Sequence, residues 1–537
     1  MNMKETITLT PQDREEYLWN QDALHFGHPL TPLFASYMIP AMTEGTRISM
    51  GRLKAPFRQF IGKVHDGYFY QAVVPAPGDP ETLQREHQEA LKDLFHDQHQ
   101  RMMRIVEERL LPLHQELDTM AKGPISAPSA IAALNRIQEI YQVFWATHFE
   151  IVVPRMAAGF AFEEIFTKAF PNRPPTDAYL LLLGTMNRSL ESDRALWNLA
   201  QEAKQMPSVY AAFSEDDMVG ALHTSNEGVR FLHRLDALLQ VYGWRTVHSH
   251  EFIHEAWVEN PAYALSVIKT YLTEDFDFDQ HWDQVVTTRI QRVNEAVAAI
   301  ADPALREQFI AIHENALNAW PIDEDHHFYI DAMLPAKARQ VMLRIGELLV
   351  NQHQLAGRDD LFFLYQDELI NLLNHAGPAD LPHLIHSRRE QYQIQLTKTP
   401  VPQFGTPPDA EPDLLMVRVF GGGSPSLEGA TREVRGFAAS PGRYVGPVRI
   451  VHGPEEFFKV KPGDVLVCRT TAPSWTGLFA TVGAVITETG GILSHAATVA
   501  REYGIPCVVG TRTATHVFSD GDRVCVDGAE GTATVDD

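Results

Sequence analysis

The chain has 537 residues, of which 45% are hydrophobic and 21% charged, as in a soluble globular protein with room for two or more domains. Its formal net charge of −24 argues against nucleic acid and anionic membrane as partners, because both would repel it. No apolar run reaches the ~18 residues of a membrane-spanning helix, and the first residues lack the apolar core of a signal peptide, so we expect a cytoplasmic protein.

The N-terminal part of the chain, to about residue 80, is rich in aromatic residues and histidine. Prolines at positions 29 and 32 exclude a continuous helix, so we expect irregular structure here. The cluster of Trp19, His25 and His28 is of a kind found more often in packing than in chemistry.

From about residue 80 to 395 the hydrophobic residues recur every three or four positions, which predicts amphipathic helices. Met102, Val106 and Leu110 show this spacing, and Pro335 is expected to open another helix of the same kind. We therefore expect a mainly α-helical domain over residues 1–398.

One polar segment stands out within this helical region. It places Arg245, His248, His250 and Glu251 within seven residues. Composition alone favours a solvated helix end for this segment.

Residues 399–413 are rich in proline and acidic residues, and three consecutive glycines follow at 421–423. A stiff spacer followed by a flexible point is suited to a domain that swings. We therefore assign residues 399–432 to a linker and hinge, and residues 433–537 to a small α/β domain.

The α/β domain contains the most informative stretch of the chain, T-E-T-G-G-I-L-S-H-A-A-T-V-A-R-E-Y-G-I-P-C-V-V-G from Thr487 to Gly510. A β-branched run at 484–486 predicts a strand, and the two glycines predict a loop. Ser494 is a good helix N-cap, and Gly504 ends the helix before a second strand at 507–509. His495 is thus expected on an exposed first turn of a helix.

This position favours phosphate chemistry. A helix N-terminus offers free N–H groups and a positive dipole end to an anion, and a neutral imidazole there can attack phosphorus. The candidate phosphate-binding residues are Thr487, Thr489, Gly490, Gly491 and Ser494. From these residues alone it stays open whether His495 acts as a nucleophile or merely caps a helix. The cysteines Cys468, Cys507 and Cys525 fit neither a disulfide framework nor a zinc site, so no metal is expected.

The motif G-G-x-x-S-H-A-A-x-V-A-R-E-x-G-I-P-x-V-V-G resembles the phosphohistidine motif of the phosphoenolpyruvate-utilising enzymes. That group includes phosphoenolpyruvate synthase, pyruvate phosphate dikinase and rifampicin phosphotransferase, and it carries the motif on a swivelling domain. Flanking segments, among them T-T-A-P-S-W-T from Thr470, are similar too. The resemblance covers about the last hundred residues and implies that His495 carries a phosphoryl group.

A looser resemblance extends to the helical region. Y-G-W-R from Tyr242 and W-V-E-N-P from Trp257 are similar to a pattern in the substrate-binding domain of rifampicin phosphotransferase. This implies that Arg245 clamps the transferring phosphoryl group and that His248 or His250 takes the acceptor proton, with the assignment among the three left open. The implied substrate-binding residues are Trp19, His25, His28 and Glu251.

No phosphoryl-donor site is evident, since the chain has no G-x-x-x-x-G-K-[ST] loop and no room before residue 80 for an ATP-grasp domain. The organisation resembles phenylphosphate synthase and 4-cresol (4-methylphenyl phosphate) synthase, in which a separate ATP-grasp subunit binds Mg-ATP. By this resemblance the β-phosphoryl group of ATP passes through His495 to a phenol.

Two alternatives remain. One is a kinase of another alcohol or of an antibiotic that uses an ATP-grasp partner. The other is a phosphocarrier or regulatory protein that relays the phosphoryl group of His495 to another protein. A closed pocket facing Arg245 would favour the enzyme, and a flat polar surface would favour the relay.

Overall fold

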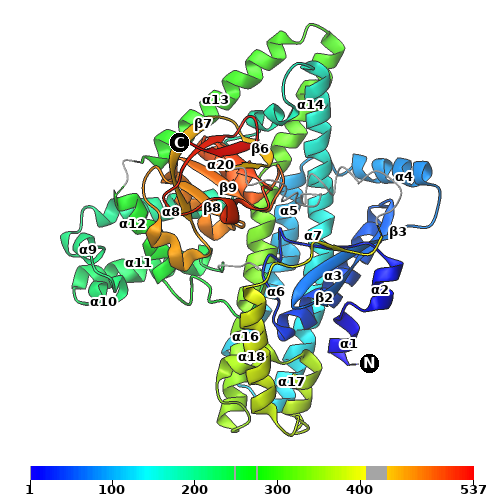
Figure 1. Cartoon of the computed structure of the whole chain (residues 1–537), viewed down its shortest axis with the longest axis vertical. Coiled ribbons are helices and arrows are strands. Elements are labelled where there is room, and N and C mark those ends of the chain that lie inside the picture. The colour runs from blue at the N-terminus through cyan, green and yellow to red at the C-terminus, as the bar shows by residue number, and fades with distance from the viewer. Residues whose placement is uncertain (1, 247–249, 274–275, 407–431, 537) are drawn as a thin grey trace. The chain divides into compact units, whose positions relative to one another are not determined.

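The computed structural model describes residues 2–246, 250–273, 276–406 and 432–536, which form two compact units (Figure 1). The first unit consists of Met1–Met156, His248–His254 and Tyr329–Glu411. The second consists of Ala157–Val247, Glu255–Phe328 and Pro412–Asp537.

This division differs from the expected boundary at residue 398. The helical residues Ala157–Val247 and Glu255–Phe328 group with the C-terminal α/β residues. The sequence could not show this, because the chain leaves the first unit at Met156, inside one helix, α7 (Ala127–Ala169).

In the first unit, helices pack with a four-stranded antiparallel sheet of order β2-β3-β1-β4. Its strands are β1 (Trp19–Gln21), β2 (Phe57–His65), β3 (Tyr68–Pro75) and β4 (Gln403–Phe404). Its helices are α1 (Met3–Ile7), α2 (Pro11–Glu16), α3 (Pro32–Arg52), α4 (Pro80–Lys92), α5 (Gln98–Ile105), the π-helix η1 (Val106–Leu110), α6 (Leu111–Lys122), α7 to Met156, α16 (Met333–Asn351), η4 (Arg358–Phe363), α17 (Gln366–Leu373) and α18 (Leu381–Leu396). The π-helix η3 (His327–Ala332) leads into this unit.

The prediction of irregular structure before residue 80 is wrong. Pro32 does not exclude a helix but opens α3, at the first helical position where its missing N–H costs nothing. Strands β2 and β3 pair across a tight turn at Asp66 and Gly67, whose φ angles are 47° and 83°. Two positive φ angles in a two-residue hairpin are the reason for an Asp-Gly pair.

The predicted linker begins later than expected. Strand β4 pairs with β1, and Tyr70 Oη donates to the Val401 carbonyl at 2.7 Å, so residues up to 404 belong to the first unit. The rest of the predicted hinge, 407–431, lies outside the described residues.

In the second unit, helices accompany an eight-stranded sheet of order β5-β12-β11-β7-β8-β9-β10-β6. The helices are η2 (Pro175–Leu181), α8 (Arg188–Ala203), α9 (Pro207–Ala212), α10 (Met218–His223), α11 (Asn226–Tyr242), α12 (Ala262–Thr273), α13 (Phe278–Ala299), α14 (Pro303–Ala319), α15 (Ile322–His326), η5 (Pro454–Lys459), η6 (Pro473–Ala480), α20 (His495–Tyr503) and α21 (Ala514–Val517). The strands are β5 (Glu433–Arg435), β6 (Phe437–Ser440), β7 (Arg443–Ile450), β8 (Val465–Cys468), β9 (Ala484–Thr487), β10 (Cys507–Val509), β11 (Arg523–Asp527) and β12 (Thr532–Val535).

Four neighbouring strands, β7 to β10, run parallel. Helix α20, which connects β9 to β10 in sequence, lies against the sheet (Figure 1). The predicted strand, helix and strand around His495 are confirmed. Gly504 ends α20 with a left-handed φ of 68°.

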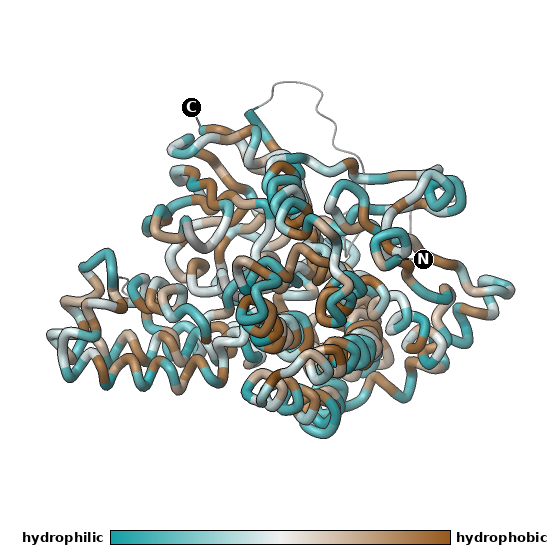
Figure 2. Tube along the Cα trace, turned by 90° about the horizontal axis from the view of Figure 1, so that it is seen from below, coloured by the Kyte–Doolittle hydropathy of each residue, from teal (hydrophilic) through white to brown (hydrophobic). Residues whose placement is uncertain are grey.

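The helical periodicity is also confirmed, because Met102, Val106 and Leu110 are buried. Helix α16 begins at Met333, two residues before the expected Pro335. Hydrophobic and hydrophilic residues alternate around the helices (Figure 2), and among the described residues none of the helices is both long and apolar enough to cross a bilayer.

Candidate functional site

His495 opens helix α20 at the carboxyl ends of two parallel strands, β8 and β9. Thr471 follows β8 and the glycine loop follows β9, so both segments reach the same edge of the sheet. In open α/β sheets the carboxyl ends of parallel strands are where ligands bind. Gly490 has a φ of 103°, a conformation in which a side chain would be strained.

Two hydroxyl groups hold the imidazole ring of His495. Thr471 Oγ1 lies 2.9 Å from Nδ1, and Thr476 Oγ1 lies 3.2 Å from Nε2. In the tautomer whose Nδ1–H donates to Thr471, Nε2 carries a lone pair, which is what a nucleophilic imidazole requires. The ring is therefore oriented from both of its nitrogen atoms.

His495 is buried, with 9% of its surface exposed, and this corrects the expectation of an exposed first turn. Burial, together with the nearby positive charges of His327 and Arg245, lowers its pKa to about 3. The imidazole is therefore neutral at physiological pH, which is the form that acts as a nucleophile.

A buried carboxylate faces the imidazole. Glu324 of α15 lies with Oε2 3.9 Å from His495 Nε2, and Ser189 of α8 donates to the same oxygen at 2.6 Å. Burial raises the pKa of Glu324 above its ordinary value. This residue and Ser189 come from helices far from the phosphohistidine motif in sequence.

Arg245 belongs to the same unit as His495 and is buried, and its role as a phosphoryl clamp stays a prediction. Its guanidinium lies over the rings of Phe328 and Trp257, at 5.4 and 5.6 Å from their centroids. Burial lowers its pKa, and the carboxylates of Asp193 and Glu324 oppose that shift. Arg245 is thus a cation held among aromatic rings, within electrostatic reach of His495.

Asp193 and Tyr503 complete this side of the site. Tyr503 Oη donates to Asp193 Oδ2 at 3.2 Å, and burial raises the pKa of Asp193 to about 7. The contact joins α8 to the end of α20, so it fixes the helix that carries His495.

The predicted phosphate-binding hydroxyls differ in their contacts. Thr487 Oγ1 donates to the Thr489 carbonyl at 2.7 Å, and Thr489 Oγ1 donates to the Arg469 carbonyl at 3.0 Å. Both hydroxyl protons therefore shape the loop, and the phosphate-binding roles of these residues stay predictions. Ser494 Oγ is buried, makes no capping bond, and has no hydrogen-bond partner among the described residues. Gly491 is not in the left-handed region.

The predicted substrate-binding residues lie in the first unit. Trp19 is fully buried against Tyr68 and Tyr70, and its Nε1 donates to the Asp13 carbonyl at 2.7 Å, so it is a core residue. Glu251 is also fully buried. It accepts hydrogen bonds from Thr31 N, Thr31 Oγ1 and Phe252 N at 2.6 to 2.8 Å, and burial raises its pKa to about 7. These contacts hold both side chains within the protein, and their substrate-binding roles stay predictions.

Two of the predicted histidines, His25 and His250, lie among aromatic rings. His25 pairs with Asp22 at 2.9 Å, and its ring centroid is 6.1 Å from that of His250. His250 in turn stacks on Trp145 at 6.0 Å.

His28 is buried with Nδ1 3.1 Å from the Pro29 carbonyl. His248 lies outside the described residues. The roles of His248 and His250 as general bases stay predictions.

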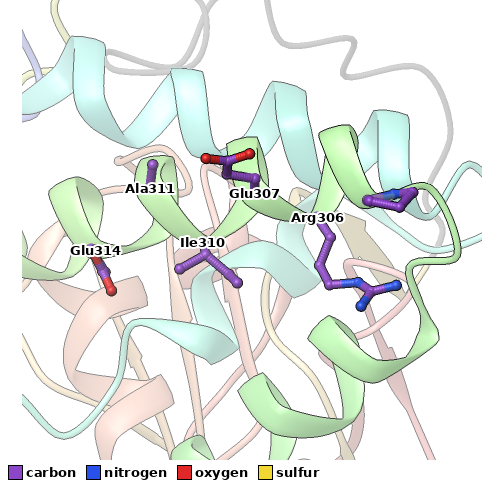
Figure 3. A pocket seen from close by; sticks show the side chains of 6 residues that line it. Arg306, Glu307, Ile310, Ala311 and Glu314 are labelled. Carbon is purple, nitrogen blue, oxygen red and sulfur yellow. The ribbon is translucent and has the colours of Figure 1, made fainter.

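A groove of about 320 Å³ lies along α14, and the residues that line it differ from those around His495 (Figure 3). It is lined by Pro303, Arg306, Glu307, Ile310, Ala311 and Glu314. Figure 3 shows these side chains along a single helix, none of them is a hydrogen-bond partner of the His495 ring, and we assign the groove no ligand.

The sequence motif identified His495 but missed the residues around it. Thr471 and Thr476 lie in the T-T-A-P-S-W-T segment, which could have pointed to them. Ser189, Asp193 and Glu324 have no local pattern that would mark them.

Comparison with known proteins agrees with the site. Residues 460–531 match the family described as the PEP-utilising enzyme mobile domain, and residues 147–319 match the rifampicin phosphotransferase fourth domain.

Three relatives illustrate the similarity. The chain is 36% identical to the "uncharacterized phosphotransferase YvkC" of Bacillus subtilis (strain 168), over 99% of this chain and 63% of the relative. It is 25% identical to a rifampicin phosphotransferase of Bacillus cereus, over 64% of this chain and 39% of that protein. It is 27% identical to the prodigiosin synthesizing transferase PigC of Serratia marcescens, over 65% of this chain and 39% of that protein.

The chain thus spans less than two thirds of the length of these relatives. The matched mobile domain contains the buried, hydroxyl-held His495 described above. Residues 460–531 are therefore similar to the mobile domain of the phosphoenolpyruvate-utilising enzymes, and residues 147–319 to the fourth domain of rifampicin phosphotransferase.

Proposed function

We propose that this protein is a phosphotransferase in which His495 carries a phosphoryl group to a small-molecule hydroxyl acceptor. The observation that carries the proposal is the neutral imidazole of His495, held by Thr471 and Thr476 at the carboxyl edge of a parallel sheet. The names of the relatives, phosphotransferases among them, support the same reaction class.

The first half-reaction loads His495. Mg-ATP, bound by a separate ATP-grasp subunit, supplies the β-phosphoryl group, and with water the products are phosphohistidine, AMP and inorganic phosphate. In this proposal the attacking atom is Nε2, with the imidazole in the tautomer whose Nδ1–H donates to Thr471 Oγ1, 2.9 Å away. The partner subunit and its nucleotide are part of the proposal and rest on the resemblance to two-component aryl phosphate synthases.

The second half-reaction passes the phosphoryl group to the acceptor. Arg245 is placed to neutralise the oxygens of the transferring group, since it is a buried cation within electrostatic reach of His495. The acceptor is a phenol such as phenol or 4-cresol, and aromatic side chains such as Phe328 and Trp257 around Arg245 suit a flat ring.

The surroundings of His495 favour an enzyme over a protein relay. A relay has to present its phosphohistidine to a second protein, whereas His495 is buried beside the charged residues Glu324 and Arg245. A buried polar site of this kind excludes water from a group that water would hydrolyse. A kinase of another alcohol or an antibiotic would use the same residues with a different acceptor.

The product of the complete reaction tests the proposal. The chain, an ATP-grasp partner, β-labelled Mg-ATP and 4-cresol should yield labelled 4-cresyl phosphate. Omission of the partner, or His495→Ala, should abolish the product, and His516→Ala, a histidine of α21 in the same domain, is the control that should keep it. Formation of labelled product by His495→Ala would refute the proposal. If the wild type forms an organic phosphate with other hydroxyl compounds only, the phenol assignment is wrong.

A further inference from the structure

We propose that Glu324 is the general base that takes the proton of the acceptor hydroxyl when the phosphoryl group leaves His495. This inference deepens the proposed function and rests on it. It assigns the proton-accepting role to a residue of α15, a short helix that neither the phosphohistidine motif nor the polar segment around Arg245 contains.

The geometry places the carboxylate at the reacting nitrogen. Glu324 Oε2 is 3.9 Å from His495 Nε2, too long for a hydrogen bond but close enough to flank a phosphoryl group on that nitrogen. Phosphoryl transfer is roughly in line, so the acceptor oxygen approaches on the side of phosphorus opposite Nε2. A carboxylate beside the phosphoryl group is within reach of a hydroxyl that approaches it.

One hydrogen bond orients the base. Ser189 Oγ donates to Oε2 at 2.6 Å, and each residue is buried, at 1% and 2% exposure. A carboxylate oxygen has two lone pairs, so Oε2 keeps one for the acceptor hydroxyl. Ser189 is thus a positioning residue for Glu324.

The charges around Glu324 are mixed. Arg245 and His327 favour its ionised form, whereas Asp325, on its own helix, favours the protonated form. Asp193 and Glu502, whose pKa values burial raises to about 7, face the same region and add negative charge when they are ionised, whereas His495 is neutral there. Burial outweighs the cations and raises the pKa of Glu324, toward the range in which a carboxylate is an effective base.

Protons and charge balance in this step. The acceptor O–H bond breaks, and its proton goes to the Glu324 carboxylate. The acceptor oxygen forms a bond to phosphorus, and the phosphorus bond to Nε2 breaks, with its electron pair returning to the nitrogen. Nδ1 keeps its proton, donated to Thr471, so the imidazole leaves neutral. Glu324 then loses its proton to solvent.

Other buried groups at the site are less suited to this role. Asp193 accepts from Tyr503 Oη, which joins it to the structural contact between α8 and α20. The hydroxyls of Thr471 and Thr476 face the imidazole and are too weakly basic to deprotonate an acceptor.

The test separates loading from release. His495 is loaded with labelled phosphate, from ATP and the partner or from phosphoramidate, and loss of label is then followed in a single turnover with 4-cresol and with water as acceptors. Glu324→Gln, which still accepts from Ser189, should load at the wild-type rate and release at least about 100-fold more slowly to both acceptors. Ser189→Ala should load normally and release at an intermediate rate.

The matched control is Glu163→Gln. Glu163 is also a buried carboxylate of the second unit that accepts from one hydroxyl, that of Tyr179, and its substitution should leave release unchanged. Release by Glu324→Gln at the wild-type rate would overturn the inference. Failure of the wild type to load His495 would instead refute the proposed function.

The pH dependence provides a readout that needs no variant. Because only the ionised carboxylate accepts a proton, release by the wild type should accelerate as pH rises through the raised pKa of Glu324. The increase should be absent in Glu324→Gln and present in Glu324→Asp. A flat wild-type profile across this range would contradict the inference even if Glu324→Gln did not fold.

Discussion

The charge state of His495 depends on where the folded chain places it. In a flexible peptide its pKa would be near 6.5, and burial together with the nearby His327 and Arg245 lowers it to about 3. The protein therefore keeps the ring neutral and nucleophilic without a proton having to be removed. In the proposed reaction the same Arg245 charge attracts the phosphoryl group on His495.

Substitution of Arg245 should affect the rates of the two half-reactions differently. If it clamps the phosphoryl group during release, Arg245→Ala should load His495 at a near-normal rate and pass the group on about 100-fold more slowly. Arg245→Lys should restore little, because an ammonium cannot reproduce the planar fork of the guanidinium. Single-turnover measurements of loading and of release check this.

Arg339→Lys is the matched control for Arg245. Arg339 is a buried arginine of α16 whose guanidinium donates to the Phe252 carbonyl at 2.7 Å and lies over the ring of Phe362. Its substitution should therefore lower the melting temperature and leave the ratio of the loading rate to the release rate unchanged. Equal slowing of loading and release by Arg245→Ala would move the phosphoryl clamp to another residue.

Among single residues, the sequence identified those that belong to a local motif. His495 and its N-cap position could be predicted because strand, glycine loop and helix follow one another within a short stretch. Glu324 and Ser189 could not, since they meet His495 only through packing of α15 and α8. Packing was the favoured interpretation for Trp19, which is buried, whereas Glu251 was expected at a solvated helix end and is also buried, because burial cannot be judged from residue type.

Helix α20 is fixed at both ends. At its start, Thr471 and Thr476 hold His495. At its end, Glu502 Oε2 accepts from Gly184 N at 2.9 Å, and the Glu502 carbonyl lies 2.9 Å from His281 Nε2. These contacts determine how the reactive nitrogen faces Glu324.

Glu502 makes the stability of this arrangement depend on pH. Burial raises its pKa to about 7 from an ordinary 4.5, so the folded state binds its proton more tightly than the unfolded state does. Its contribution is complete below pH 4.5 and is lost as pH rises through about 7. Glu502→Gln keeps an acceptor for Gly184 N and does not titrate.

The difference in melting temperature between Glu502→Gln and wild type should therefore become more positive from about pH 5 to about pH 8. Thermal unfolding followed by circular dichroism at several pH values measures it. Glu347→Gln, at a partly exposed carboxylate paired with Arg344, is a control whose difference should stay flat. A flat difference for Glu502→Gln as well would show that this carboxylate is ionised in the folded protein.

The success of element prediction followed the strength of local signals. The β9–α20–β10 segment was predicted correctly, since β-branched runs, paired glycines and an N-cap agree there. The hairpin of β2 and β3 was missed although Asp66–Gly67 is a strong turn signal. Pro32 was read as a helix breaker because proline has opposite effects inside a helix and at its first position.

At the scale of the whole molecule, the two units alternate along the chain. Three separate stretches build each unit, and the helical residues 157–247 and 255–328 share a unit with the phosphohistidine domain. Composition places a boundary at the proline-rich stretch and does not predict this grouping. The reason is that helix α7 continues without a break through Met156, where the chain passes from the first unit to the second. The grouping matters for function, since it brings Ser189, Arg245 and Glu324 to His495.

The central claim is that His495 itself carries the phosphoryl group. The most direct measurement is to load the protein from β-labelled ATP with the ATP-grasp partner, digest it under alkaline conditions and locate the label by mass spectrometry. The account predicts one acid-labile, base-stable phosphohistidine at residue 495, linked through Nε2, which disappears when 4-cresol is added as labelled 4-cresyl phosphate forms. Label on another residue, or product formation without any phosphohistidine at residue 495, would contradict it.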